Sequence, residues 1–138
     1  MEGRTTLKSY FEKDDMPTQA QFASQIDSVP NILDDGILVG GDGNITAHAG
    51  GGQANAYQLT KKVNKVTVCA TLGDSVKLPI GVPGMVLHVW HMGSKAMFLY
   101  PSSGGQLNDY SIDSYGELYG TDIKMFTCYA TNKWYYLL

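Results

Sequence analysis

The chain has 138 residues, a length that suits one domain built around a single hydrophobic core. Its formal net charge is -3 at pH 7 and only 17% of its residues are charged, which argues against a nucleic-acid partner because binding a phosphate backbone requires clustered basic side chains. No stretch approaches the roughly 20 apolar residues that cross a bilayer. Residues 1–15 also lack the apolar segment of a signal peptide, so we expect neither a membrane partner nor secretion by that route.

Residues 1–30 are predicted to form a helical anchor segment. Thr18-Gln19-Ala20-Gln21 is a capping box, in which the Thr18 and Gln21 side chains bond each other's backbone amides. Apolar side chains follow at helical spacing until Pro30 ends the helix. Because so short a helix is marginal in water, the segment must dock on another surface. The predicted attachment residues are Leu7, Phe11, Phe22, Ile26 and Val29.

Residues 31–62 are predicted to be a glycine-rich arm or linker. We expect a short strand pair at residues 37–39 and 45–47, joined by a turn, and then an extended segment through Gly50-Gly51-Gly52. Two interpretations stay open. The arm threads between protomers, since glycine tolerates close backbone approach, or it is an ordinary surface loop.

Residues 63–138 are predicted to form an antiparallel β-sandwich, similar to a jelly roll, so that the whole fold is mainly β with a short α-helical leader. Short segments of alternating polarity are separated there by Gly, Pro, Asp and Asn turns. The segment 85–91 is largely apolar on both faces, with Leu87 and Val89 on one and Trp90 on the other, and should lie inside a sandwich or against a partner subunit. Strands are expected at residues 66–71, 75–79, 85–91, 95–100, 117–119, 122–131 and 134–137.

The sequence contains no recognisable catalytic, metal-binding or phosphate-binding motif. The triple glycine at 50–52 lacks the Lys and Ser/Thr of a phosphate-binding loop. His88 and His91 are three apart on a predicted strand and point to opposite faces, so they cannot share a metal ion. No nucleophile has a recognisable neighbouring base. We therefore expect no catalytic, cofactor-binding or metal-binding residues, and we expect Cys69 and Cys128 to be buried free thiols.

Aromatic residues are concentrated in the C-terminal half. Such rings usually fill a core or a subunit interface, although several exposed rings together would make a carbohydrate-stacking platform. The loop from residue 107 to residue 116 is the best candidate for an exposed recognition surface. Its predicted recognition residues are Tyr110, Asp113 and Tyr115.

Several short motifs follow one another along the chain. They are Leu7-Lys8-Ser9-Tyr10-Phe11-Glu12, Ala49-Gly50-Gly51-Gly52-Gln53-Ala54-Asn55-Ala56, Gly73-Asp74-Ser75-Val76-Lys77-Leu78-Pro79, Pro83-Gly84-Met85, Met97-Phe98-Leu99-Tyr100-Pro101, Leu107-Asn108 and Trp134-Tyr135. Their order resembles virion proteins of tailed bacteriophages, in which a helical leader precedes a small β domain. The resemblance covers most of the chain.

The resemblance implies a structural, non-enzymatic virion protein, either a capsid decoration protein or a head-fibre subunit. Such a protein is assembled in the host cytoplasm, attaches to the particle through its N-terminal region and projects an oligomeric β domain. The expected partners are other virion proteins, the major capsid protein first, and further copies of the chain in a homotrimer, which closes without free strand edges.

Two alternatives belong to other functional classes. One is a receptor- or carbohydrate-binding module at a tail or fibre tip, which would need exposed aromatic rings beside polar side chains between Tyr110 and Tyr119. The other is a depolymerase domain, which would need a carboxylate pair in a cleft, formed by Asp109 with Asp113 or with Glu117.

Overall fold

The computed structural model describes residues 18–28, 37–121 and 123–137. The chain divides into two compact units, Met1–Asp35 and Gly36–Leu138. Within the described ranges, no helix is long and apolar enough to cross a membrane.

Helix α2 (Gln19–Ser28) begins at the predicted capping box. The Thr18 amide donates to Gln21 Oε1 at 2.7 Å, and the Gln21 amide donates to Thr18 Oγ1 at 3.3 Å. Two predicted attachment residues, Phe22 and Ile26, lie one helical turn apart, and both side chains are exposed. The other three, Leu7, Phe11 and Val29, lie outside the described residues.

The second unit is mainly β, as predicted, and the seven strands expected between residues 66 and 137 are all present with boundaries shifted by a few residues. The sequence missed β2 and β7. The strands are β1 (Gly41–Thr46), β2 (Tyr57–Gln58), β3 (Val63–Val68), β4 (Ser75–Lys77), β5 (Val86–His91), β6 (Met97–Tyr100), β7 (Gln106–Leu107), β8 (Gly116–Leu118), β9 (Ile123–Ala130) and β10 (Lys133–Tyr135).

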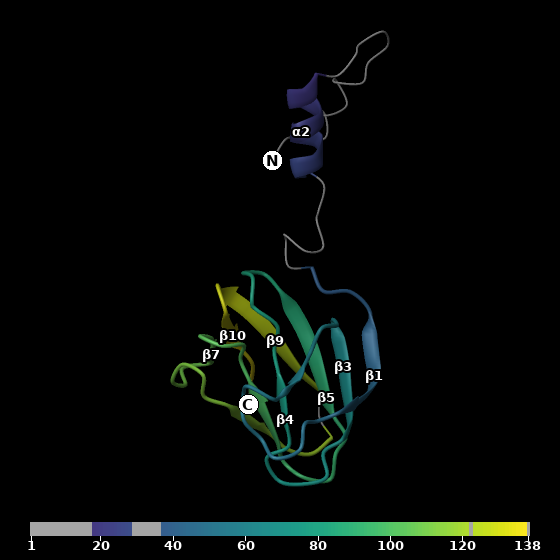
Figure 1. Cartoon of the computed structure of the whole chain (residues 1–138), viewed down its shortest axis with the longest axis vertical. Helices are drawn as coiled ribbons and strands as arrows, with labels where there is room; N and C mark the ends of the chain where they lie inside the picture. The colour runs from purple at the N-terminus through teal and green to yellow at the C-terminus, as the bar shows by residue number, and fades with distance from the viewer. Residues whose placement is uncertain (1–17, 29–36, 122, 138) are drawn as a thin grey trace. The chain divides into compact units, whose positions relative to one another are not determined.

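The strands form two sheets between which the chain alternates. The six-stranded sheet has the order β1-β3-β5-β9-β10-β7, seen in Figure 1, and the four-stranded sheet has the order β2-β4-β6-β8. From β1 to β8 each strand lies in the sheet opposite to its predecessor, so β1, β3 and β5 pair in parallel, as do β2, β4 and β6. Parallel neighbours need a crossover connection. Here that connection is a strand of the other sheet, as in a solenoid.

The prediction of an antiparallel, jelly-roll-like sandwich is therefore wrong in its topology. Among the described strand pairs, three are antiparallel: β5 with β9, β9 with β10, and β6 with β8. The turns at Gly73 and Gly84 are present, both with φ of +91°. They do not close hairpins, because the strands they join lie in different sheets.

The predicted arm supplies strands to this unit. The expected pairing of residues 37–39 with 45–47 is wrong, because β1 pairs with β3 and residues 37–39 form no strand. Gly50, Gly51 and Gly52 all have positive φ, a conformation that favours glycine. They turn the chain from β1 towards β2 on the opposite sheet.

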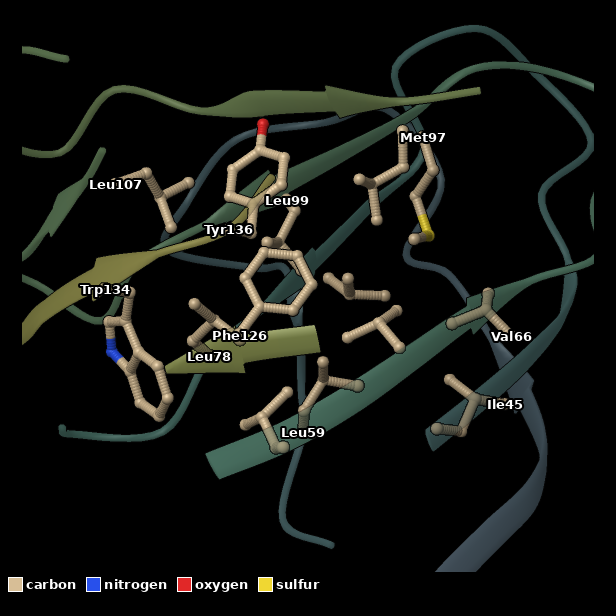
Figure 2. Packing of buried hydrophobic residues seen from close by; sticks show 14 of the residues in the cluster. Ile45, Leu59, Val66, Leu78, Met97, Leu99, Leu107, Phe126, Trp134 and Tyr136 are labelled. Atoms are coloured by element: carbon tan, nitrogen blue, oxygen red, sulfur yellow. The ribbon is translucent and has the colours of Figure 1, made fainter. Parts of the chain in front are cut away.

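Both sheets contribute to one hydrophobic core. Within β5, Leu87 and Val89 are buried whereas Val86, His88 and Trp90 are partly exposed, so alternate residues face the core. Figure 2 shows side chains from both sheets converging. The largest fully buried side chains include Trp134, Phe126, Ile45, Leu59, Leu78, Leu87, Met97, Leu99 and Leu107.

Candidate functional site

A pocket of about 710 Å³ opens beside the loop that follows β7. Its lining comes from residues 109–119 and from Tyr136, and it combines four tyrosines, two carboxylates, two serines and a glycine. We call it the tyrosine pocket. Tyr110, Tyr115 and Tyr119 are exposed at their side chains, so the pocket presents aromatic surface to solvent.

The ring of Tyr115 is held by aromatic neighbours. It stacks on Phe98 with ring centroids 4.0 Å apart and an interplanar angle of 14°. The Tyr100 ring meets it at a tilt, with centroids 5.5 Å apart. Since Phe98 and Tyr100 belong to β6, the exposed ring is fixed to the four-stranded sheet.

The loop between β7 and β8 is tied to β10 by Asn108. The Asn108 amide donates to the Trp134 carbonyl at 2.7 Å, and Asn108 Oδ1 accepts from the Tyr136 amide at 2.9 Å. Asn108 is buried and has a φ of 47°, a left-handed conformation that Asn tolerates better than most residues. This arrangement places Tyr136 beneath the loop.

Tyr136 forms the floor of the tyrosine pocket. Its side chain is only 2% exposed, and its ring packs against Phe126 with centroids 4.7 Å apart. In Figure 2 the hydroxyl points away from the hydrophobic cluster. Burial, with the neighbouring Tyr110 phenol as a second cause, raises the pKa of Tyr136 to about 12.

The Tyr136 hydroxyl makes no hydrogen bond of ordinary geometry within the part of the chain that the structure describes, although the Tyr110 phenol lies near enough to contribute to its raised pKa as a hydrogen-bonding neighbour. Buried hydroxyls are almost always hydrogen-bonded, since an unmet bond costs free energy. Gly116 lets the hydroxyl reach this position, because a Cβ at residue 116 would collide with Tyr136 Oη. The pocket thus contains a buried polar atom whose hydrogen bonding within the described residues is poor.

The structure brings together part of the predicted recognition surface. Tyr110 and Tyr115 both line the tyrosine pocket, but Asp113 does not. Asp113 Oδ1 instead accepts from Gln53 Nε2 and from the Gly104 amide, both at 2.8 Å. Asp113 therefore holds the loop in place, and its recognition role stays a prediction.

Two carboxylates, Asp109 and Glu117, line the same pocket. The sequence named this pair for the depolymerase alternative, whereas Tyr136 was assigned only to the general aromatic cluster. Tyr136 shares its strand face with Trp134, and that alternation predicts a core residue. No sequence signal marks a core tyrosine whose hydroxyl lacks a partner.

A second pocket of about 460 Å³ adjoins the first through the shared residue Asp109. Its other lining residues are Thr127, Tyr129 and Tyr135, from β9 and β10. The tyrosine pocket therefore borders on the six-stranded sheet.

The histidines and cysteines lie apart from these pockets. His91 is buried and its Nδ1 lies 2.8 Å from the Gly120 carbonyl, while His88 alternates to the opposite face of β5. Cys69 and Cys128 are buried and free, as predicted. In the described ranges, no three His, Cys, Asp or Glu side chains gather in a way that could hold a metal ion.

Comparisons with protein-family models, with curated proteins and with solved structures find no match for this chain. The resemblance to phage virion proteins therefore stays a prediction that rests on the sequence motifs.

Proposed function

We propose that this chain is a structural, non-enzymatic bacteriophage virion protein, a capsid decoration protein or head-fibre subunit, assembled in the host cytoplasm and retained in the virion. The order of the sequence motifs supports the class of protein. The observation that carries the assembly role is the outer face of the six-stranded sheet, which is apolar across several adjacent strands.

The outer face is built from residues that alternate with the buried ones on β3, β5, β9 and β10. Strand register aligns Val63, His88 and Met125 in one row across three strands. A second row aligns Lys65, Trp90 and Ile123, and a third aligns Val86, Thr127 and Tyr135. Val63, Ile123, Met125, Tyr129 and Tyr135 are all exposed. A contiguous apolar patch of this kind is typical of a protein interface.

The occupant that suits this face is a second copy of the chain. The three rows contain no carboxylate, and their one cation, Lys65, holds its Nζ 4.5 Å from the centroid of the Trp90 ring. Such a surface offers little to attract a charged partner, whereas identical apolar faces can bury one another. Three copies that turn this face towards a common threefold axis would each bury it against both neighbours in a closed ring, so a homotrimer is the assembly we favour.

Attachment to the particle is assigned to the N-terminal region, with the major capsid protein as the partner. On α2 the Ile26 side chain is 72% exposed, and an exposed apolar residue on a short helix suits docking to a preformed surface. Repeated attachment through symmetric copies would raise the avidity of the assembly for the shell.

The test of the assembly role is the mass of the protein in solution, measured by light scattering after size-exclusion chromatography. The unmodified chain should be a trimer at micromolar concentration. Met125→Glu places a carboxylate in the middle of the outer face and should give monomers. The matched control is Leu72→Glu, because Leu72 is exposed but lies in the turn between β3 and β4. A monomeric unmodified chain, or a Met125→Glu protein with unchanged mass, would contradict the proposal.

A second measurement tests attachment separately. Ile26→Asp should leave the trimer intact but reduce its co-sedimentation with capsids of the major capsid protein. Leu72→Asp again serves as the control. Equal occupancy of the two variants would remove the anchor assignment.

A further inference from the structure

We propose that the tyrosine pocket binds a neutral saccharide unit, with the buried Tyr136 hydroxyl as one of its hydrogen-bonding groups. The tyrosine pocket adjoins the outer face at Asp109, but none of its lining residues belongs to the three rows of that face, so this inference does not depend on the assembly role.

The walls of the pocket suit a sugar ring. Tyr110, Tyr115 and Tyr119 present rings at the pocket, and Tyr119 is 64% exposed. The apolar C–H face of a pyranose packs against such rings, which offer large rigid surfaces with a polar end. Stacking on Phe98 fixes Tyr115 before any ligand arrives, and a preorganised ring loses little entropy on binding.

The polar groups of the pocket select against a negatively charged ligand. Asp109 and Glu117 supply carboxylate acceptors, and Ser111 and Ser114 supply hydroxyls, while the described residues that line the pocket include no Lys, Arg or His. A uronic acid or a phosphate would meet the carboxylates with no basic side chain to offset the repulsion. Sugar hydroxyls donate to carboxylates without adding negative charge.

Tyr136 distinguishes a saccharide from a cation. A quaternary ammonium would fit aromatic rings beside carboxylates, but it can neither accept a hydrogen bond from a phenol nor donate one to it. A sugar hydroxyl does both. Because Tyr136 Oη is buried, lines the pocket and makes no hydrogen bond of ordinary geometry among the described residues, a ligand with its own hydroxyl completes the site better than one without.

Titration calorimetry on the full-length protein tests the assignment. The probes are maltotetraose, cellotetraose and chitotetraose as neutral saccharides, tetragalacturonate as the acidic one, and tetramethylammonium, which has no hydroxyl, as the cation. At least one neutral probe should bind, and the other two kinds should not. Tyr119→Ala should weaken binding about tenfold by removing a stacking surface. Tyr136→Phe should weaken it by about three- to tenfold, the value of one hydrogen bond.

The matched control is Tyr57→Ala, since Tyr57 is an exposed tyrosine outside the pocket. Its affinity for the neutral probe should equal that of the unmodified chain. Circular dichroism of each variant shows that the fold is kept.

Absence of binding to all three neutral probes at millimolar concentration would overturn the proposal, as would tighter binding of tetragalacturonate or tetramethylammonium. Equal weakening by Tyr57→Ala would overturn it too. Release of reducing ends from a bound probe would support the site but contradict the non-enzymatic function, because Asp109 and Glu117 would then act as a catalytic pair. Binding retained by the Met125→Glu protein would support a site complete within one subunit.

Discussion

Gln53 and Asp113 are 60 residues apart in the chain, yet the Gln53 side-chain amide donates to Asp113 Oδ1 at 2.8 Å. The same amide nitrogen also donates to the Pro101 carbonyl at 3.0 Å. These bonds join the glycine-rich segment to the loop that carries the tyrosine pocket. Two segments that the sequence treats as an arm and a recognition loop are one connected structure.

The first prediction concerns this connection. Asp113→Ala should lower the free energy of unfolding by about 1 to 2 kcal/mol, because it removes the acceptor for Gln53 and Gly104. The φ of residue 113 is +62°, which Ala tolerates less well than Asp or Asn. Asp113→Asn keeps an acceptor oxygen and should cost clearly less. Urea unfolding of the two variants measures the difference, and equal losses would show that the acceptor is not what matters.

The second prediction uses the ionisation of Tyr136, whose folded-state pKa of about 12 lies above its ordinary value of 10.0. The unfolded chain therefore loses this proton first as the pH rises, so stability is complete below pH 10 and falls between pH 10 and pH 12. Two pKa units correspond to about 2 to 3 kcal/mol. The Tyr136→Phe variant has no phenol to ionise at this position, so its stability should fall less between pH 10 and pH 12.

At pH 7 the same variant should unfold at higher urea, since it removes a buried hydroxyl that has no partner among the described residues. The expected gain is about 1 kcal/mol. A Phe variant that is less stable at pH 7, or that loses stability with the same slope above pH 10, would show that the hydroxyl is satisfied in the free protein.

The third prediction concerns Asp74, a buried carboxylate in the turn between β3 and β4. Burial acts to raise its pKa, but hydrogen bonds from the Thr71 hydroxyl and from the Thr71 and Ala70 amides outweigh burial and lower it. Its stabilising contribution is therefore present above the ordinary carboxyl pKa of roughly 4 and is lost as the pH falls towards its lower folded-state value.

Asp74→Asn should lower the free energy of unfolding at pH 7 by about 1 to 3 kcal/mol, because Asn carries no negative charge and its side-chain nitrogen cannot accept the hydrogen bond from the Thr71 hydroxyl. The gap between the variant and the unmodified chain should narrow as the pH is lowered below 4. Asp109→Asn, at an exposed position, is the control at pH 7 and should change stability little. A gap that stays constant with pH would mean that the Asp74 charge contributes nothing.

The sequence predicts the strands well because their signals are local. Alternation of polarity and the turns at Gly73 and Gly84 depend on neighbouring residues, and both turns lie where expected. Strand pairing depends on partners far along the chain. A turn that leads into a hairpin and one that leads across to the opposite sheet can use the same residues, so the parallel pairing of β3 with β5 was not predictable.

The candidate site shows the same limit. Exposed rings in a Gly- and Asp-containing loop were recognisable from the sequence, and Tyr110 and Tyr115 do line the pocket. Asp113 is a polar residue in an exposed loop, as a recognition residue would be. Its carboxylate instead accepts a hydrogen bond from Gln53, a partner that no local sequence pattern indicates. Tyr136 has the pattern of a core residue, and only the packing around its hydroxyl marks it as part of a site.

The last prediction compares two truncations. Among the described residues, the buried hydrophobic core lies between Ile45 and Tyr136, within the unit Gly36–Leu138. A chain of residues 36–138 should therefore keep its thermal unfolding midpoint and its oligomeric state while losing attachment to capsids.

A chain of residues 63–138, which begins at the domain boundary expected from the sequence, lacks β1 and β2 and with them the fully buried Ile45 and Leu59. Loss of one such side chain costs about 2 to 5 kcal/mol, and the stability of a domain of this size is about 5 to 15 kcal/mol, so this shorter chain should be largely unfolded. Far-ultraviolet circular dichroism and thermal melts distinguish the two, and a stable, cooperative fold for residues 63–138 would mean that the glycine-rich segment is an arm after all.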